Sequence, residues 1–140
     1  MANITFEEVN VGDEIPSFVI ELNQMMLWIY AGASGDFNLI HVDKEFGESV
    51  GLGGTIAHGL SSMARLSKTI NDWTEDPGAL KKLSVQMRNP ARPGDTVTFW
   101  GKVVEKKEED GRKLVVLDVG ADNQDGVQIL TKGNAVVELD

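Results

Sequence analysis

Tyr30-Ala-Gly-Ala-Ser-Gly-Asp36-Phe-Asn38-Leu-Ile-His41 is a polar, glycine-interrupted segment between two apolar runs with helical character. It brings an acid, an amide and an imidazole within six positions, and His58-Gly59 follows at the head of the second run. Burying charged and amide groups costs free energy unless they are paired. These residue types between hydrophobic segments therefore indicate a site for proton transfer rather than a contribution to stability.

The run before this segment predicts a buried helix. Asn23 is a plausible N-cap, residues 25 to 31 are apolar nearly all round, and Gly32 and Gly35 end the pattern. The run after it predicts a second, longer helix that begins near Thr55 or Ile56 and ends before Asp76-Pro77-Gly78. Its apolar stripe consists of Leu60, Met63, Leu66, Ile70 and Trp73.

The remaining segments favour strands. Residues 4 to 22 carry extended-type signals, and from residue 80 onward apolar and polar residues alternate with period two. Asp110-Gly111 and Asp125-Gly126 are hairpin signals. Short connections demand antiparallel neighbours, so we expect an α+β fold in which a C-terminal meander packs over the long helix. Residues 1–140 should form one domain, and an uncovered sheet face or edge favours a dimer.

Composition narrows the function classes. The formal net charge is -9, which disfavours nucleic acid and anionic membranes as partners. There is no cysteine and no secretory signal, so a cytoplasmic protein is expected, without disulfides or a thiol nucleophile. An acidic carrier protein would need a local basic patch, although a solvated face is the alternative for these cations. The candidates are Lys81, Lys82, Arg88, Arg92 and Lys102.

Asp36 and His41 are the candidate catalytic pair. An imidazole is the natural general base near neutral pH, and a neighbouring carboxylate can orient it or share a bound water. The pair suits water activation. Asn38 lies between them and is a candidate substrate-binding residue, with side-chain bonds that hold the loop as the alternative.

Gly59 is the third catalytic candidate. In the first turn of a helix its free N–H can stabilise a developing oxyanion, although glycine can also serve close helix–sheet packing. His58 and Ser67 are candidate substrate-binding residues; a packing role is the alternative for His58, and exposure to solvent is the alternative for Ser67. Without cysteine, a His-Glu-x-x-His helix or an acidic calcium loop, we expect no metal and no cofactor.

The two motifs, Tyr30 to His41 and Thr55-Ile-Ala-His58-Gly59-Leu60, resemble the hydratase signature of MaoC-like hot-dog proteins. That family includes (R)-specific enoyl-CoA hydratases and 3-hydroxyacyl-thioester dehydratase subunits of fatty-acid synthesis. The resemblance implies an antiparallel sheet wrapped around a long helix. It also implies that Asp36 and His41 deprotonate a water for addition to a trans-2-enoyl thioester, with the Gly59 amide on the thioester oxygen. Leu39 departs from the pattern, because the family usually has proline there.

The expected activity is therefore hydration of trans-2-enoyl thioesters or the reverse dehydration of (3R)-hydroxyacyl thioesters. Coenzyme A or acyl carrier protein would be the handle of the substrate. A hot-dog thioesterase is the nearest rival, but Asp36 paired with His41 favours hydration. A homodimer is expected, and a heterodimer with a related hot-dog subunit is the alternative.

Overall fold

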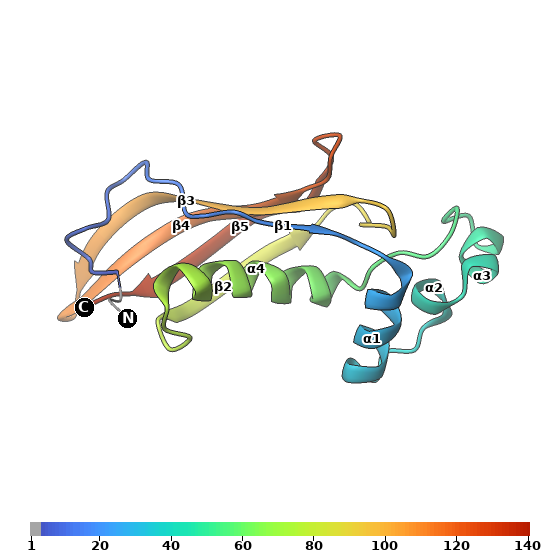
Figure 1. Cartoon of the computed structure of the whole chain (residues 1–140). Helices are drawn as coiled ribbons and strands as arrows, with labels where there is room; N and C mark the ends of the chain where they lie inside the picture. Colours follow the sequence, from blue (N-terminus) through green and yellow to red (C-terminus); the bar gives the residue numbers. More distant parts are fainter. Residues whose placement is uncertain (1–3) are drawn as a thin grey trace.

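The computed structural model describes residues 4–140. Five antiparallel strands form one sheet in the order β1-β3-β4-β5-β2, and the long helix α4 lies along one of its faces (Figure 1). The strands are β1 (Phe18–Glu21), β2 (Leu80–Met87), β3 (Thr96–Glu109), β4 (Arg112–Asp122) and β5 (Gln128–Glu138). The helices are α1 (Gln24–Ser34), α2 (Leu39–Val42), α3 (Lys44–Ser49) and α4 (Gly59–Thr74). The expected α+β class, with a sheet around a long helix, is confirmed.

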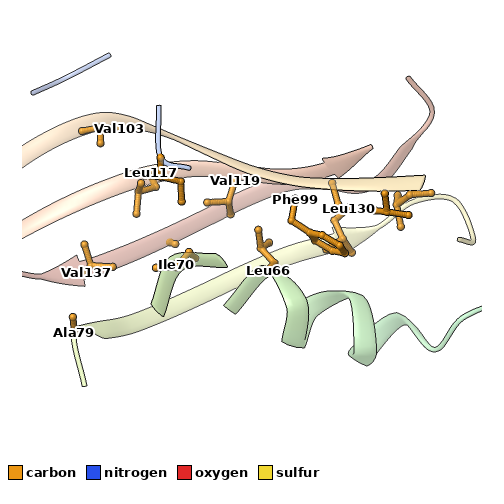
Figure 2. Close-up of a cluster of buried hydrophobic side chains, with 14 of the residues drawn as sticks. Leu66, Ile70, Ala79, Phe99, Val103, Leu117, Val119, Leu130 and Val137 are labelled. Atoms are coloured by element: carbon orange, nitrogen blue, oxygen red, sulfur yellow. The ribbon is translucent and has the colours of Figure 1, made fainter. Parts of the chain in front are cut away.

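The core lies between α4 and the sheet. Leu66 and Ile70 of α4 are fully buried and face Phe99, Leu117 and Val119 of the central strands (Figure 2). Burying a side chain of this size stabilises the fold by about 1.5–3 kcal/mol. The core therefore fixes α4 along the sheet, and with it the position of the residues at the start of α4.

Helix α1 corrects the expectation of a buried helix. Its N-cap is Asn23, whose side chain accepts a bond from the amide of Met26, but only Leu27 and Ala31 are buried. Trp28 and Ile29 are 51% and 65% exposed. The reason is position: α1 lies at one end of the molecule beside α2 rather than against the sheet (Figure 1). An apolar run all round predicts burial only where a second layer covers it.

Two element boundaries and one strand pairing also differ from the expectation. The N-terminal strand is confined to β1, because residues 6 to 8 and 11 to 12 form turns. Helix α4 begins at Gly59, later than Thr55 or Ile56, and Leu60 of its expected stripe is 63% exposed. The meander holds for β3, β4 and β5, but β2 pairs with β5 at the far edge.

No helix in residues 4–140 has the length and apolar character needed to cross a bilayer.

Candidate active site

The polar segment folds into a short loop and the one-turn helix α2. Asn38 caps this helix, since its side-chain oxygen accepts a bond from the amide of Ile40 at 3.2 Å. His41 is buried on α2, whereas the side chain of Asp36 is 52% exposed. Their closest atoms, His41 Nε2 and Asp36 Oδ2, lie 3.7 Å apart. The predicted pair is therefore brought together, at a separation that suits a shared water better than a direct bond.

The hydrogen bond at the other ring nitrogen fixes the tautomer of His41. Its Nδ1 lies 2.7 Å from the carbonyl oxygen of Ile56. A carbonyl can only accept, so Nδ1 carries the proton and the neutral ring has its lone pair on Nε2. The basic nitrogen of His41 is therefore the one next to Asp36.

His58 packs against the ring of His41. The two imidazoles stack with centroids 3.8 Å apart and planes inclined by 23°. His58 Nε2 donates to the main-chain carbonyl of Asp36 at 3.0 Å, and its Nδ1 has no partner within residues 4–140. The ring of Tyr30 lies on His58 with a centroid distance of 4.7 Å. The structure thus places His58 between Tyr30 and His41, as a support for the Asp36 loop.

The cluster of Asp36, His41 and His58 does not fit a metal centre. One donor atom from each residue lies within 4.8 Å of the others. However, the lone pair of an imidazole lies in the plane of its ring, and the two rings lie in separate, nearly parallel planes, whereas a tetrahedral ion needs donors that converge on one point. The geometry suits proton transfer rather than metal binding.

Gly59 opens α4 beside this pair. As the first helical residue it has no acceptor for its N–H within the helix, and the N-cap His58 makes no side-chain capping bond. A Cβ added at Gly59 would collide with the sulfur of Met87 on β2. Close packing of α4 against β2 is therefore one reason for glycine at position 59. The N–H of Gly59 stays available as a hydrogen-bond donor.

His41 and Gly59 line the same cavity, which has a volume of about 340 Å³. Its walls are mainly apolar, and Arg88, Asn89 and Ser62 add polar groups. The apolar lining residues are Leu52, Ile56, Ala57, Met87, Pro90, Ala91, Ile129 and Leu130. A base and a free amide thus face a pocket of the size and character of a small-ligand site.

The first turns of α4 carry a hydrogen-bonded cation. The hydroxyl of Ser61 donates to the carbonyl of His58 at 2.7 Å, and Arg65 Nη1 donates to the same hydroxyl at 3.2 Å. Burial lowers the pKa of Arg65 below its ordinary value, and the phenol of Tyr30 opposes this shift. The guanidinium stays charged at neutral pH and adds positive charge near the start of the helix.

The other predicted residues are dispersed. Ser67 lies in a separate groove with Leu60 and Met63, between α4 and β2. The five basic candidates do not form one patch: Arg88 lines the cavity, the Arg92 guanidinium donates to the carbonyl of Leu52, and Lys102 lies on β3. Lys81 and Lys82 lie on β2 beside the Ser67 groove. Substrate-binding roles for Asn38, His58 and Ser67 stay predictions.

Sequence reasoning missed most of the cavity wall. Met87, Asn89 and Leu130 come from β2, the segment after it, and β5, far along the chain from the motifs. It also missed Gln24 and its hydrogen bond with Thr55, whose hydroxyl donates to Gln24 Oε1 at 2.5 Å. Only the place of Thr55 as the first residue of the second motif pointed to this network.

Comparison with known proteins agrees with this architecture. A MaoC-like domain model matches residues 8–125. The (R)-specific enoyl-CoA hydratase of Rhodospirillum rubrum is 31% identical over 107 residues, which cover 73% of this chain and 74% of that protein. Fatty acid synthase subunit beta of Saccharomyces cerevisiae is 30% identical over 135 residues, 94% of this chain but 6% of that protein.

Among solved structures, the unliganded R-hydratase PhaJ1 of Pseudomonas aeruginosa superposes with a TM-score of 0.87 at 26% identity. The match covers 98% of this chain and 86% of that one. The sheet-wrapped helix, the paired motifs at its head and these matches lead to one assignment: the chain belongs to the MaoC-like domain family and has the hot-dog fold.

Proposed function

We propose that this protein is a hydro-lyase that adds water to trans-2-enoyl thioesters to give (3R)-hydroxyacyl thioesters, and catalyses the reverse dehydration. One observation carries the proposal. The basic Nε2 of His41 lies 3.7 Å from Asp36 Oδ2, and the same imidazole shares an apolar cavity with the free amide of Gly59. Hydration of an enoyl thioester needs this set of groups and no redox cofactor.

The geometry supports the following reaction. A water held between Asp36 and His41 gives a proton to His41 Nε2 while its oxygen bonds to C3 of the enoyl group. The electron pair of the double bond moves toward the thioester, whose oxygen becomes an enolate stabilised by the Gly59 N–H. The imidazolium then returns the proton to C2 from the same side. Hydroxyl and hydrogen are thus added syn, and the residues return to their starting state.

The apolar cavity fits the acyl part of the substrate, and Arg88 in its wall is suited to an anionic handle. Coenzyme A and acyl carrier protein both present a phosphorylated pantetheine, so either is a partner of the required chemistry. The absence of cysteine is compatible with a reducing compartment, and we place the reaction in the cytoplasm.

We infer a homodimer from the open edge of the sheet. Strand β2 pairs on one side with β5 and is the last strand of the sheet, so its other side offers unpaired backbone groups. Leu60, Met63 and Leu83 line an apolar groove beside this edge. Sedimentation of the purified chain should give a mass of twice 15.2 kDa. A monomer, or a complex that needs a second chain, would contradict the homodimer.

The function is tested with crotonyl-CoA. We expect loss of the absorbance of the conjugated thioester, formation of (3R)-hydroxybutyryl-CoA and no release of free thiol. Release of coenzyme A thiol without a hydroxy product would instead establish the rival thioesterase. Formation of the (3S) product would contradict the proposed face of addition.

A further inference from the structure

The one-turn helix α2, which carries His41, ends in carbonyls that have no partner within the helix. The last carbonyls of any helix need hydrogen-bond donors from elsewhere. Here the carbonyl of Leu39 accepts from the amide of Asp43. The carbonyls of the next three residues accept from donors farther away in the sequence. Ile40 O accepts from the amide of Ile56 at 3.0 Å. The carbonyls of His41 and Val42 accept from side chains of α1.

Those two side chains are Gln24 and Trp28. Gln24 Nε2 donates to the His41 carbonyl at 3.0 Å, and Trp28 Nε1 donates to the Val42 carbonyl at 3.0 Å. Residues four apart lie on one face of a helix, so α1 presents two donors one turn apart to two successive carbonyls. This also explains why Trp28 stays at the α1–α2 contact although half of its surface is exposed.

The orientation of the Gln24 amide is fixed from behind. The hydroxyl of Thr55 donates to Gln24 Oε1 at 2.5 Å, which leaves the NH₂ group for His41. Thr55 is buried and precedes Ile56, whose carbonyl binds His41 Nδ1. Both parts of His41 are therefore held by the segment Thr55-Ile56. The main-chain carbonyl of His41 is held through Gln24, and the imidazole is bound directly by the carbonyl of Ile56.

We propose that Gln24 and Trp28 are positioning residues that hold the base His41 in its catalytic place, a role that rests on the proposed hydratase function. A four-residue helix has little stability of its own. Its position relative to the cavity must come from outside bonds, and misplacing a catalytic group by about 1 Å can cost about 100-fold in rate.

The test removes each donor and leaves an unbranched side chain at Gln24 and an aromatic ring at Trp28. Gln24→Met and Trp28→Phe should each lower kcat for crotonyl-CoA by about 10-fold or more, with a small change in KM. The matched controls are Gln124→Met and Trp100→Phe, which remove the same donor groups from bonds to the carboxylates of Asp95 and Asp122; none of these four residues lines the cavity. Both controls should keep kcat within about twofold of the unaltered protein.

A second arm separates positioning from general damage. In a His41→Ala background there is no imidazole to place, so Gln24→Met and Trp28→Phe should leave the residual rate unchanged. A further drop of the same size in that background would overturn the proposal. If Trp28→Phe does not fold, Gln24→Met alone carries the comparison.

A third readout does not depend on turnover. The chain has two histidines, so the imidazole region of a ¹H–¹⁵N spectrum holds two ring systems. The proposal predicts that the His41 ring, protonated on Nδ1 in the unaltered protein, becomes a mixture of tautomers in Gln24→Met and Trp28→Phe but not in the controls. An unchanged His41 spectrum in both variants would overturn the positioning role. Absence of turnover with an altered His41 spectrum would instead count against the hydratase function alone.

Discussion

At the residue scale, the chemistry depends on which nitrogen of each histidine carries its proton. The Nδ1–H of His41 donates a hydrogen bond to a carbonyl 15 positions away, and the Nε2–H of His58 donates one to a carbonyl 22 positions away. The sequence predicts Asp36 and His41 as a pair from residue type and spacing. It cannot predict the tautomers, because each histidine meets its carbonyl partner only in the folded chain. The lone pair at His41 Nε2 is thus a property of the fold.

Gly59 allows a residue-scale prediction. Gly59→Ala forces the side chain of Met87 to move, since the added methyl would overlap its sulfur, and both residues line the cavity. We expect kcat/KM for crotonyl-CoA to fall by about 10-fold or more. The double variant Gly59→Ala/Met87→Ala should recover much of this loss, because no thioether remains for the added methyl to displace. If the double variant is as impaired as Gly59→Ala, or more so, the collision is not the cause.

At the scale of elements, turn residues predicted the structure better than the apolar pattern did. Asp110-Gly111 connects β3 to β4 with φ of 51° and 74°, as a type I′ hairpin requires. The apolar pattern of α1 suggested burial, yet α1 uses Gln24 and Trp28 to hold a neighbouring turn instead. Pattern reports which residues are apolar, whereas tertiary neighbours decide which of them are covered.

Leu39 gives a prediction for element α2. It is the first residue of the helix, where proline is favoured, and Asn38 before it has φ -53° and ψ 129°, a conformation that proline permits. Leu39→Pro should raise the free energy of unfolding by about 0.4–1 kcal/mol and keep kcat. Chemical denaturation measures the change.

Ile40→Pro is the matched control for that prediction. It lies one position later and removes the amide that bonds to the Asn38 side chain, so it should lower the free energy of unfolding by about 1 kcal/mol or more. If the two proline variants behaved alike, the capping account of α2 would be wrong.

At the scale of the whole molecule, the order of the strands was the least predictable feature. Period two and turn signals indicate strands, and the short connections correctly imply the β3-β4-β5 meander. They do not indicate that residues 88 to 95 carry the chain from one edge of the sheet to β3 on the other side of β4 and β5. That crossing places Arg88, Asn89 and Pro90 against the cavity, which is why sequence reasoning missed this wall.

Ion pairs at the end of the sheet opposite α1 predict an acid dependence of stability. The hydrogen bond from Arg112 holds the pKa of Glu138 below its ordinary value of 4.5, with a further contribution from Lys81. A lowered carboxyl pKa stabilises the folded state above pH 4.5, and this contribution is lost as the pH falls through the folded-state pKa. Glu138→Gln should therefore lower Tm at pH 7, and the difference from the unaltered protein should shrink toward pH 3.

The control for the acid dependence is Glu45→Gln, on exposed α3, for which no ion pair is found in the part of the chain that the structure describes. Its Tm should track the unaltered protein at each pH. A Tm difference for Glu138→Gln that stays constant from pH 7 to pH 3 would show that the ion pair is not its source.

The central claim is that Asp36 and His41 activate one water for an enoyl thioester in this cavity. The most direct measurement is the rate of crotonyl-CoA hydration for the unaltered protein, Asp36→Asn and His41→Ala, with Asp72→Asn on the exposed face of α4 as the matched control. We expect turnover to fall by about 100- to 10,000-fold in the two site variants and to be unchanged in Asp72→Asn. Hydration that persists at the full rate in both site variants would contradict it.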